Sequence, residues 1–120
     1  MNLDNFDSLL ELEEQIKQEQ ENNSLHLNIN EIAEKQYDWV ERMGWHNKTP
    51  LEALALIGSE VGEAVNECRG ETPTDNFKYE LADIVLRVSD LAHWQGIDLA
   101  LAIAEKMAVN EKRGTRNRVF

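Results

Sequence analysis

Apolar residues recur at intervals of three and four along most of the chain, and this period predicts α-helices. No segment alternates apolar and polar residues in the manner of a half-buried β-strand. The spacing predicts five helices, over about residues 4–21, 28–43, 50–69, 73–94 and 99–113. Short connections join the last four, as in an antiparallel bundle. We therefore expect an all-α fold with an antiparallel four-helix bundle-like core and an additional N-terminal helix.

The expected helix ends carry capping signals. Thr49-Pro50-Leu51-Glu52 has a capping Thr, Pro at the first helical position and Glu at the third, which is the capping-box pattern. Thr72-Pro73 predicts the next start, and Asp98 is placed to cap the last helix. Asn28 and Asn30 are alternative caps for the helix that ends near residue 43. These signals fix the expected order of helices along the chain.

The first 24 residues differ from the remainder of the 120-residue chain. They are strongly acidic and end in Asn22-Asn23-Ser24, a polar run typical of a linker. We predict an N-terminal accessory helix or arm over residues 1–24 and one helical domain over residues 25–120, which is long enough to form a single core.

Composition narrows the possible partners and location. The formal net charge of −11 disfavours binding to nucleic acid polymers or to an anionic membrane. Cys68 is the single cysteine, so the chain has no intrachain disulfide and gives no support for a cysteine-based zinc site. The acidic N-terminus lacks the features of a signal peptide, and no apolar run reaches the length of a membrane span. We expect a cytoplasmic protein.

Two pairs of acids lie within apolar stretches that are predicted to be helical: Glu60-Val61-Gly62-Glu63 and Glu80-Leu81-Ala82-Asp83. The spacing of three places both acids of a pair on one helix face. If the two helices pack face to face, the acids meet, and a divalent cation would offset the cost of crowded anions. An all-oxygen ligand set favours Mg²⁺, or Mn²⁺ as a substitute. The same spacing also fits the solvated edges of two acidic helices.

A third set of polar residues follows on the last predicted helix. Lys106, Asn110 and Arg113 are spaced to share one face of that helix. If this face looks toward the carboxylates, its cations would neutralise a polyphosphate. If it looks outward, it is a solvated stripe, and periodicity does not distinguish the two arrangements.

In order and spacing, Glu60-x-x-Glu63, Glu80-x-x-Asp83 and Lys106-x-x-x-Asn110-x-x-Arg113 resemble the MazG-type all-α nucleoside triphosphate pyrophosphohydrolases. The resemblance covers about residues 30–113, and the family pattern often has a further Glu where this chain has Ser59. It implies Mg²⁺-dependent hydrolysis of a nucleoside or deoxynucleoside triphosphate to the monophosphate and pyrophosphate. It also implies a role in nucleotide-pool control or house-cleaning, and a homodimer or homotetramer.

The resemblance assigns roles to residues of this chain. The implied metal ligands are Glu60, Glu63, Glu80 and Asp83. Glu63 is the carboxylate expected to orient or deprotonate the attacking water. The implied contacts to phosphate or sugar are Lys106, Asn110 and Arg113.

Aromatic residues supply candidates for a base pocket, because their faces stack on nucleobases. The candidates are Trp39, Trp45 and His46, of which Trp45 and His46, in the helix break at Gly44, are favoured for substrate binding. Trp39 fits the apolar stripe of its helix and is expected in the core. Gln36 falls in the same stripe, where a boundary position is expected.

Two alternatives to the enzyme remain open at this point. A catalytically silent helical oligomerisation or adaptor module would keep the bundle without the chemistry. A di-iron carboxylate bundle would use acid-x-x-His motifs, of which Asp90-Leu91-Ala92-His93 is one, but a second such motif is absent from the sequence. The complete set of acids together with the cationic stripe favours the enzyme over both.

Overall fold

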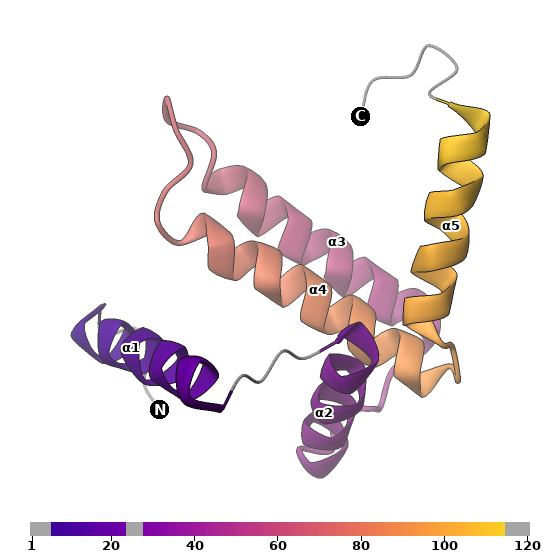
Figure 1. Ribbon diagram of the computed structural model, residues 1–120, viewed down its shortest axis with the longest axis horizontal. Helices are drawn as coiled ribbons and strands as arrows, with labels where there is room; N and C mark the ends of the chain where they lie inside the picture. Colours follow the sequence, from indigo (N-terminus) through magenta and orange to yellow (C-terminus); the bar gives the residue numbers. More distant parts are fainter. Residues whose placement is uncertain (1–5, 24–27, 115–120) are drawn as a thin grey trace.

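The computed structural model describes residues 6–23 and 28–114. Its five helices are α1 (Phe6–Asn23), α2 (Ile29–Arg42), α3 (Pro50–Asn66), α4 (Phe77–Trp94) and α5 (Leu99–Arg113) (Figure 1). Within these two described ranges the regular secondary structure is entirely helical, which confirms the predicted fold class. No helix in the described ranges is long and apolar enough to cross a membrane. The predicted boundary between arm and domain, at residues 24 and 25, lies outside the described residues.

The core is formed where α4 packs against both α2 and α3 (Figure 1). The residues buried at these contacts are small or medium in size: Ala33 and Val40 on α2, Ala64 on α3, and Ser89 and Ala92 on α4. Small side chains at a contact allow two helix backbones to approach closely. The acids of α3 and α4 are therefore carried by two helices that lie directly against each other.

The start of α5 is fastened to α2 by an amide. The side chain of Asn30 donates to Asp98 Oδ1 at 2.8 Å and accepts from the backbone N–H of Ala100 at 3.0 Å. Asp98 caps α5 as predicted, because it accepts from the N–H of Leu101 at 3.0 Å. The hydrogen bond from Asn30, and then that from Leu101, lower the pKa of Asp98. From this attachment α5 extends away from the α3–α4 pair (Figure 1).

Two other predicted helix starts are confirmed. Asn28, rather than Asn30, is the N-cap of α2, and its side chain accepts from the N–H of Glu31 at 2.9 Å. The capping box of α3 is formed in both directions, with the N–H of Glu52 bonded to the Thr49 hydroxyl at 3.2 Å and the N–H of Thr49 bonded to the Glu52 carboxylate at 3.3 Å. Both starts thus follow from side-chain oxygens that satisfy free backbone donors.

The connection between α3 and α4 differs from its prediction. α3 ends at Asn66 and α4 begins at Phe77, so both predicted boundaries, near residues 69 and 73, are wrong. The N–H of Thr74 donates to the Glu67 carbonyl at 3.0 Å, and the Thr74 hydroxyl donates to the Glu67 carboxylate. These bonds close a turn on the residue that follows α3. Thr72-Pro73 therefore lies within the turn and does not begin a helix.

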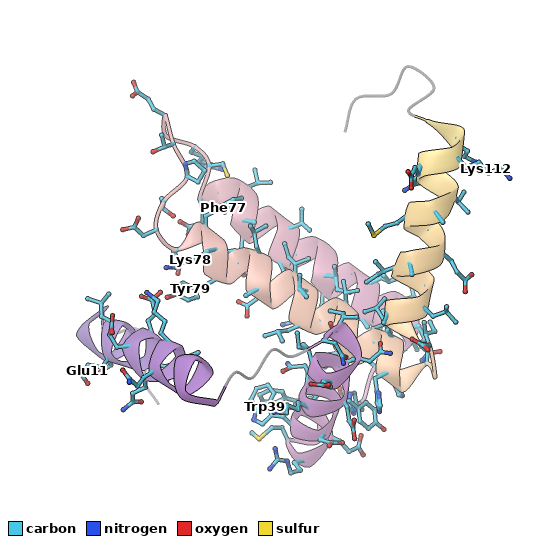
Figure 2. The ribbon with its side chains drawn as sticks, viewed as in Figure 1. Glu11, Trp39, Phe77, Lys78, Tyr79 and Lys112 are labelled. Atoms are coloured by element: carbon cyan, nitrogen blue, oxygen red, sulfur yellow. The ribbon has the colours of Figure 1, made fainter. Side chains whose placement is uncertain are left out.

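α1 meets the rest of the chain at the start of α4. Lys78 and Tyr79 extend from α4 toward α1 (Figure 2). Glu13 of α1 pairs with the Lys78 ammonium at 2.7 Å and accepts a hydrogen bond from the Tyr79 hydroxyl. The bond from Lys78, followed by that from Tyr79, lowers the pKa of Glu13. A polar contact thus places α1 beside the end of α4 that carries Glu80.

Replacing Thr49 with Ala removes the capping hydroxyl of α3, so we expect the free energy of unfolding to fall by about 1 kcal/mol. Thr72→Ala is the matched control, since Thr72 is exposed in the turn between α3 and α4, and it should change stability by less than about 0.5 kcal/mol. Urea denaturation of the three proteins measures the difference. Equal losses in both variants would contradict the helix starts described above.

Candidate metal centre and adjoining pocket

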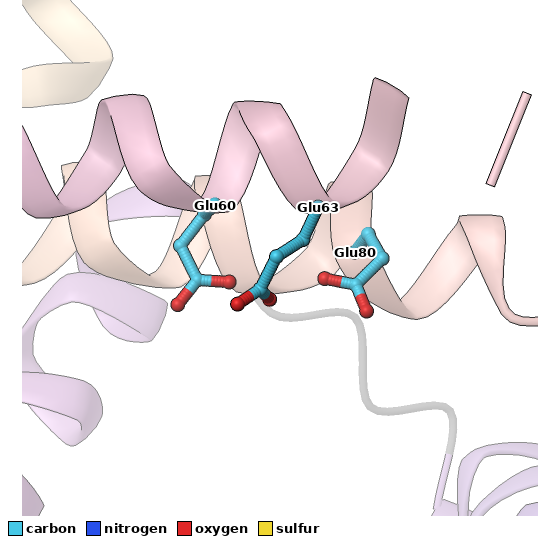
Figure 3. Close-up of side chains that lie close together, drawn as sticks. All are labelled: Glu60, Glu63 and Glu80. Carbon is cyan, nitrogen blue, oxygen red and sulfur yellow. The ribbon is translucent and has the colours of Figure 1, made fainter. Parts of the chain in front are cut away.

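Three carboxylates from α3 and α4 converge at the contact between these helices: Glu60, Glu63 and Glu80 (Figure 3). One oxygen atom from each residue lies within 4.8 Å of the corresponding oxygens of the other two. Glu60 and Glu63 share a face of α3 because they are three residues apart, and Glu80 approaches from α4. The structure thus brings together three of the four acids that the sequence singles out.

Asp83 lies beside this group, about one helical turn after Glu80 on α4. Its carboxyl lines a pocket that Glu60 also lines. Partial burial, followed by the negative charges of Glu60 and Glu80, raises the pKa of Asp83, and the Arg87 guanidinium acts in the opposite direction. Asp83 therefore shares the electrostatic environment of the three converging carboxylates without being one of them.

The three carboxylates repel one another electrostatically. The charge of Glu60, followed by that of Glu80, raises the pKa of Glu63. The Oε2 atom of Glu80 is removed from solvent and has no hydrogen-bond partner among the described residues. A buried, unpaired carboxylate oxygen is costly unless a cation or donor reaches it. An all-oxygen donor set of this kind fits a hard divalent cation such as Mg²⁺ or Mn²⁺.

Two donors hold the carboxylates in place, and the sequence analysis identified neither. Arg87 Nε donates to Glu60 Oε1 at 2.8 Å, and Asn76 Nδ2 donates to Glu80 Oε1 at 3.0 Å. Donors of this type orient metal ligands in proteins. A sequence signal exists for Arg87, which follows Asp83 by four residues and so shares its helix face.

A pocket of about 540 Å³ adjoins the carboxylates, with walls from α2, α3, α4 and the connection between α2 and α3. Glu60 and Asp83 belong to its wall, together with three indole side chains: Trp39, Trp45 and Trp94. This volume lies within the usual range for small-molecule sites. The pocket therefore combines acidic groups with aromatic side chains.

Trp39 differs from its prediction, whereas Gln36 has the half-buried position that was expected. Trp39 is 42% exposed, and its ring meets that of Trp45 edge-on with centroids 5.1 Å apart, so the expectation of a core residue is wrong. Gln36, expected at a boundary, lines the pocket as well. Both residues face inward on α2, and a helical stripe does not distinguish a packed core from a pocket wall.

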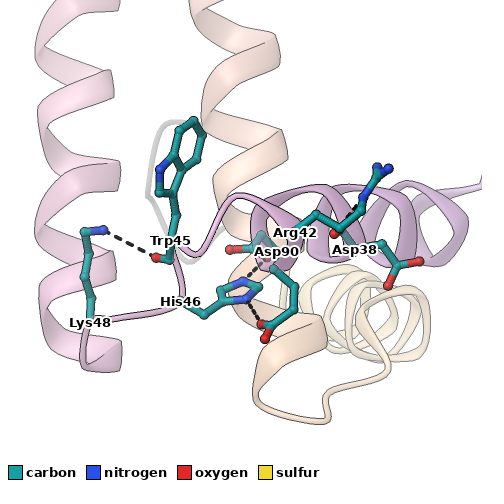
Figure 4. Close-up of polar contacts among 7 residues, drawn as sticks. Asp38, Arg42, Trp45, His46, Lys48 and Asp90 are labelled. Atoms are coloured by element: carbon teal, nitrogen blue, oxygen red, sulfur yellow. Dashed lines mark hydrogen bonds and ion pairs between the residues drawn. The ribbon is translucent and has the colours of Figure 1, made fainter.

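His46 is held firmly in the pocket wall. Its side chain is only 8% exposed, and its Nε2 and Nδ1 atoms lie 2.7 Å from Asp90 Oδ1 and 2.5 Å from Glu41 Oε2 (Figure 4). The imidazole also stacks on Tyr37 and Trp94, with centroid distances of 4.5 Å and 5.8 Å. These contacts tie the connection after α2 to the last turns of α4.

The cationic stripe of the last predicted helix lies apart from this site. Lys106 and Arg113 are exposed on α5, and Asn110 is half-buried. Neither the three-carboxylate group nor the pocket wall includes any of these three described residues. Within one chain the structure therefore does not bring the stripe to the acids.

Comparisons with known proteins identify two similar phage proteins, both named dATP/dGTP diphosphohydrolase. The chain is 40% identical to that of Salmonella phage PMBT28 over 75 residues, which are 58% of this chain and 24% of the phage protein. It is 29% identical to that of cyanophage S-2L over 85 residues, which are 68% of this chain and 75% of the relative. No family model and no solved structure matches. The chain is thus a distant relative of these proteins and spans about a quarter of the first.

The carboxylates around His46 predict a pH dependence of stability. Burial alone would lower the His46 pKa, but hydrogen bonds to Glu41 and Asp90 and the charges of these acids outweigh it and raise the pKa above 6.5. Because the folded state holds this proton more tightly than the unfolded state, the stabilisation is complete below about pH 6.5. It is lost as pH rises through the folded-state pKa.

We therefore expect the free energy of unfolding of the wild type to fall more steeply above pH 6.5 than that of His46→Gln. Denaturant titrations at several pH values measure both slopes. His93→Gln is the control, since it removes a ring that packs on Tyr37, and it should retain the wild-type slope. Parallel curves for the wild type and His46→Gln would contradict a protonated imidazole between the two acids.

Proposed function

We propose that this chain is a Mg²⁺-dependent nucleoside triphosphate pyrophosphohydrolase, which converts a nucleoside or deoxynucleoside triphosphate to the monophosphate and pyrophosphate. The observation that carries the proposal is Glu60, which belongs both to the three-carboxylate group and to the wall of the aromatic pocket. A cation held by the acids would therefore border the space available to a nucleotide. The distant phage relatives, named for hydrolysis of dATP and dGTP, support this class of reaction. We assign the chain to nucleotide-pool control or house-cleaning.

The residues that would hold the metal are Glu60, Glu63, Glu80 and Asp83. Bound Mg²⁺ would neutralise charge on the polyphosphate and make the α-phosphorus more electrophilic. Glu63 is the exposed member of the converging acids, whereas Glu60 and Glu80 are half-buried. We therefore assign Glu63 to the attacking water, whose proton it accepts. The water oxygen bonds to the α-phosphorus, the bond from that phosphorus to the α–β bridging oxygen breaks, and pyrophosphate leaves.

We assign the aromatic part of the pocket to binding of the nucleobase. Trp39 and Trp45 would offer stacking surfaces, and the Gln36 amide would offer a donor and an acceptor to base edges. His46 would act as a fixed part of the wall, since both of its ring nitrogens are occupied by acids. Because both phage relatives are named for purine deoxynucleotides, dATP and dGTP are the substrates we propose first.

We also propose that the chain forms a homodimer or homotetramer. Its radius of gyration is 16.8 Å, whereas a compact domain of 120 residues has about 14 Å. Large apolar side chains are exposed on the helices, including Leu51 of α3 at 77% and Met107 of α5 at 66%. Large apolar surfaces left exposed on a chain typically mark an interface. A second copy of the chain would cover these faces and would bring further cations from its own α5.

The first test measures pyrophosphate release from a panel of nucleoside and deoxynucleoside triphosphates, with Mg²⁺ and with a chelator. We expect turnover of dATP or dGTP that the chelator abolishes. Glu80→Gln should lower turnover at least about a hundredfold, because it removes a ligand charge while keeping the side-chain shape. Glu34→Gln, the same change at an exposed position of α2, should retain wild-type turnover.

A metal-binding readout accompanies this assay. Mg²⁺ at millimolar concentration should raise the melting temperature of the wild type and of Glu34→Gln, since a ligand that binds the folded state stabilises it. The shift should be smaller in Glu80→Gln. If no nucleotide shows metal-dependent turnover, the proposed enzymatic activity is refuted. The alternative, a helical oligomerisation or adaptor module, is then favoured.

The oligomer is tested by the mass of the wild type in solution, which should be two or four times the 13.8 kDa of one chain. Met107→Glu places a charge on the exposed apolar face of α5 and should shift the mass toward that of one chain. Glu34→Lys, at an exposed position of α2, is the control and should keep the wild-type mass. Light scattering after size-exclusion chromatography measures all three, and a wild-type monomer would contradict the proposal.

A further inference from the structure

Arg87 occupies an unusual position beside the converging carboxylates. Its Nε atom donates to Glu60 Oε1 at 2.8 Å, and the same residue lines the pocket of about 540 Å³. The Glu60 side chain is only 13% exposed, while that of Arg87 is 43% exposed. The ion pair thus joins a carboxylate in the site to a guanidinium that remains accessible from the pocket.

The geometry of the pair leaves most of the guanidinium available. Arginine has five N–H bonds in a planar fork, and the bond to Glu60 uses the one at Nε. The four N–H bonds at the two terminal nitrogens are not needed for this contact. A fork of this kind matches the oxygens of a phosphate group and can donate two parallel hydrogen bonds to them.

A second cation in the pocket wall is less suited to this task. Lys48 donates to the Trp45 carbonyl at 3.4 Å and to the Asn47 side chain at 3.0 Å, so its ammonium is engaged by the connection between α2 and α3. Arg87, in contrast, projects from the middle of α4, one turn after Asp83. Its bond to Glu60 restricts the long side chain and lowers the entropy lost when a ligand binds.

We propose that Arg87 is a polyphosphate-binding residue, held by Glu60 at the border between the carboxylates and the aromatic pocket. This assignment rests on the proposed function, because the ligand is the polyphosphate of a nucleotide bound together with a divalent cation. Glu60 would then have two roles: its Oε1 atom orients the guanidinium, and its Oε2 atom would serve the metal. A single chain would thereby supply one cationic side chain, that of Arg87, to the polyphosphate.

Binding of two probes tests the assignment without catalysis. The probes are inorganic tripolyphosphate and α,β-methylene-dATP, each with Mg²⁺, and their dissociation constants are measured by calorimetry. Arg87→Gln should weaken both by about ten- to a hundredfold, the usual effect of losing a charge-assisted hydrogen bond. Arg87→Lys, which keeps the charge but lacks the fork, should lie between the two proteins.

The affinity for Mg²⁺ alone distinguishes a polyphosphate-binding role of Arg87 from a role in which Arg87 only orients Glu60. In Arg87→Gln the affinity for Mg²⁺ alone should fall by a clearly smaller factor than the affinity for either probe, since one donor to Glu60 is lost while the carboxylates and their charges remain. Arg42→Gln is the matched control, because the Arg42 guanidinium donates to the Asp38 carbonyl of its own helix and lies outside the pocket wall. It should bind Mg²⁺ and both probes as the wild type does.

Three results would overturn the assignment. One is unchanged affinity of Arg87→Gln for both probes, and another is a loss of Mg²⁺ affinity as large as the loss for the probes. The third is a wild type that binds neither probe. If the wild type still releases pyrophosphate from dNTPs in these cases, the proposed function stands and only the role of Arg87 fails. If probe binding depends on Arg87 but no nucleotide is hydrolysed, the enzyme fails and the polyphosphate site remains.

Discussion

The contact between α3 and α4 is the constraint on which the candidate site depends. It places oxygens of Glu60, Glu63 and Glu80 within 4.8 Å of one another, although like charges at such distances repel. Helix packing, assisted by the bonds from Arg87 and Asn76, holds them there. This repulsion remains in the folded chain. A cation that fits between the carboxylates would therefore bind favourably, because the packed helices already hold its ligands close together.

The carboxylates and the aromatic wall are supported in different ways. The acids project from long helices, whereas Trp45 and His46 belong to the connection after α2. A connection is ordinarily more mobile than the elements it joins. The contacts of His46 with Glu41 and Asp90 reduce this freedom, because they bind the connection to α2 and to α4. The aromatic wall is therefore coupled to the same helix, α4, that carries Glu80.

Local signals in the sequence predicted much of this structure. The helical period and the caps at Thr49 and Asp98 identified the order of helices. The spacing of acids indicated three residues that meet and also Asp83, which lies beside them. The turn after α3 could not be predicted, because it depends on a contact between Thr74 and Glu67, seven residues apart. The position of Arg87 was missed for a related reason, since a periodic pattern identifies a helix face but not its partner.

The position of α5 connects the proposed oligomer with the proposed chemistry. The chain has an accessible surface of 9632 Å², whereas a compact monomer of 13.8 kDa has about 6,600 Å². Large apolar side chains exposed on the described helices contribute to this excess. Lys106 and Arg113 project from one of these helices and lie apart from the acids of their own chain. In the proposed oligomer they would approach the polyphosphate across a contact between copies, whereas Arg87 already lies beside the carboxylates. Assembly would therefore add cations to a site whose first cation is supplied within the chain.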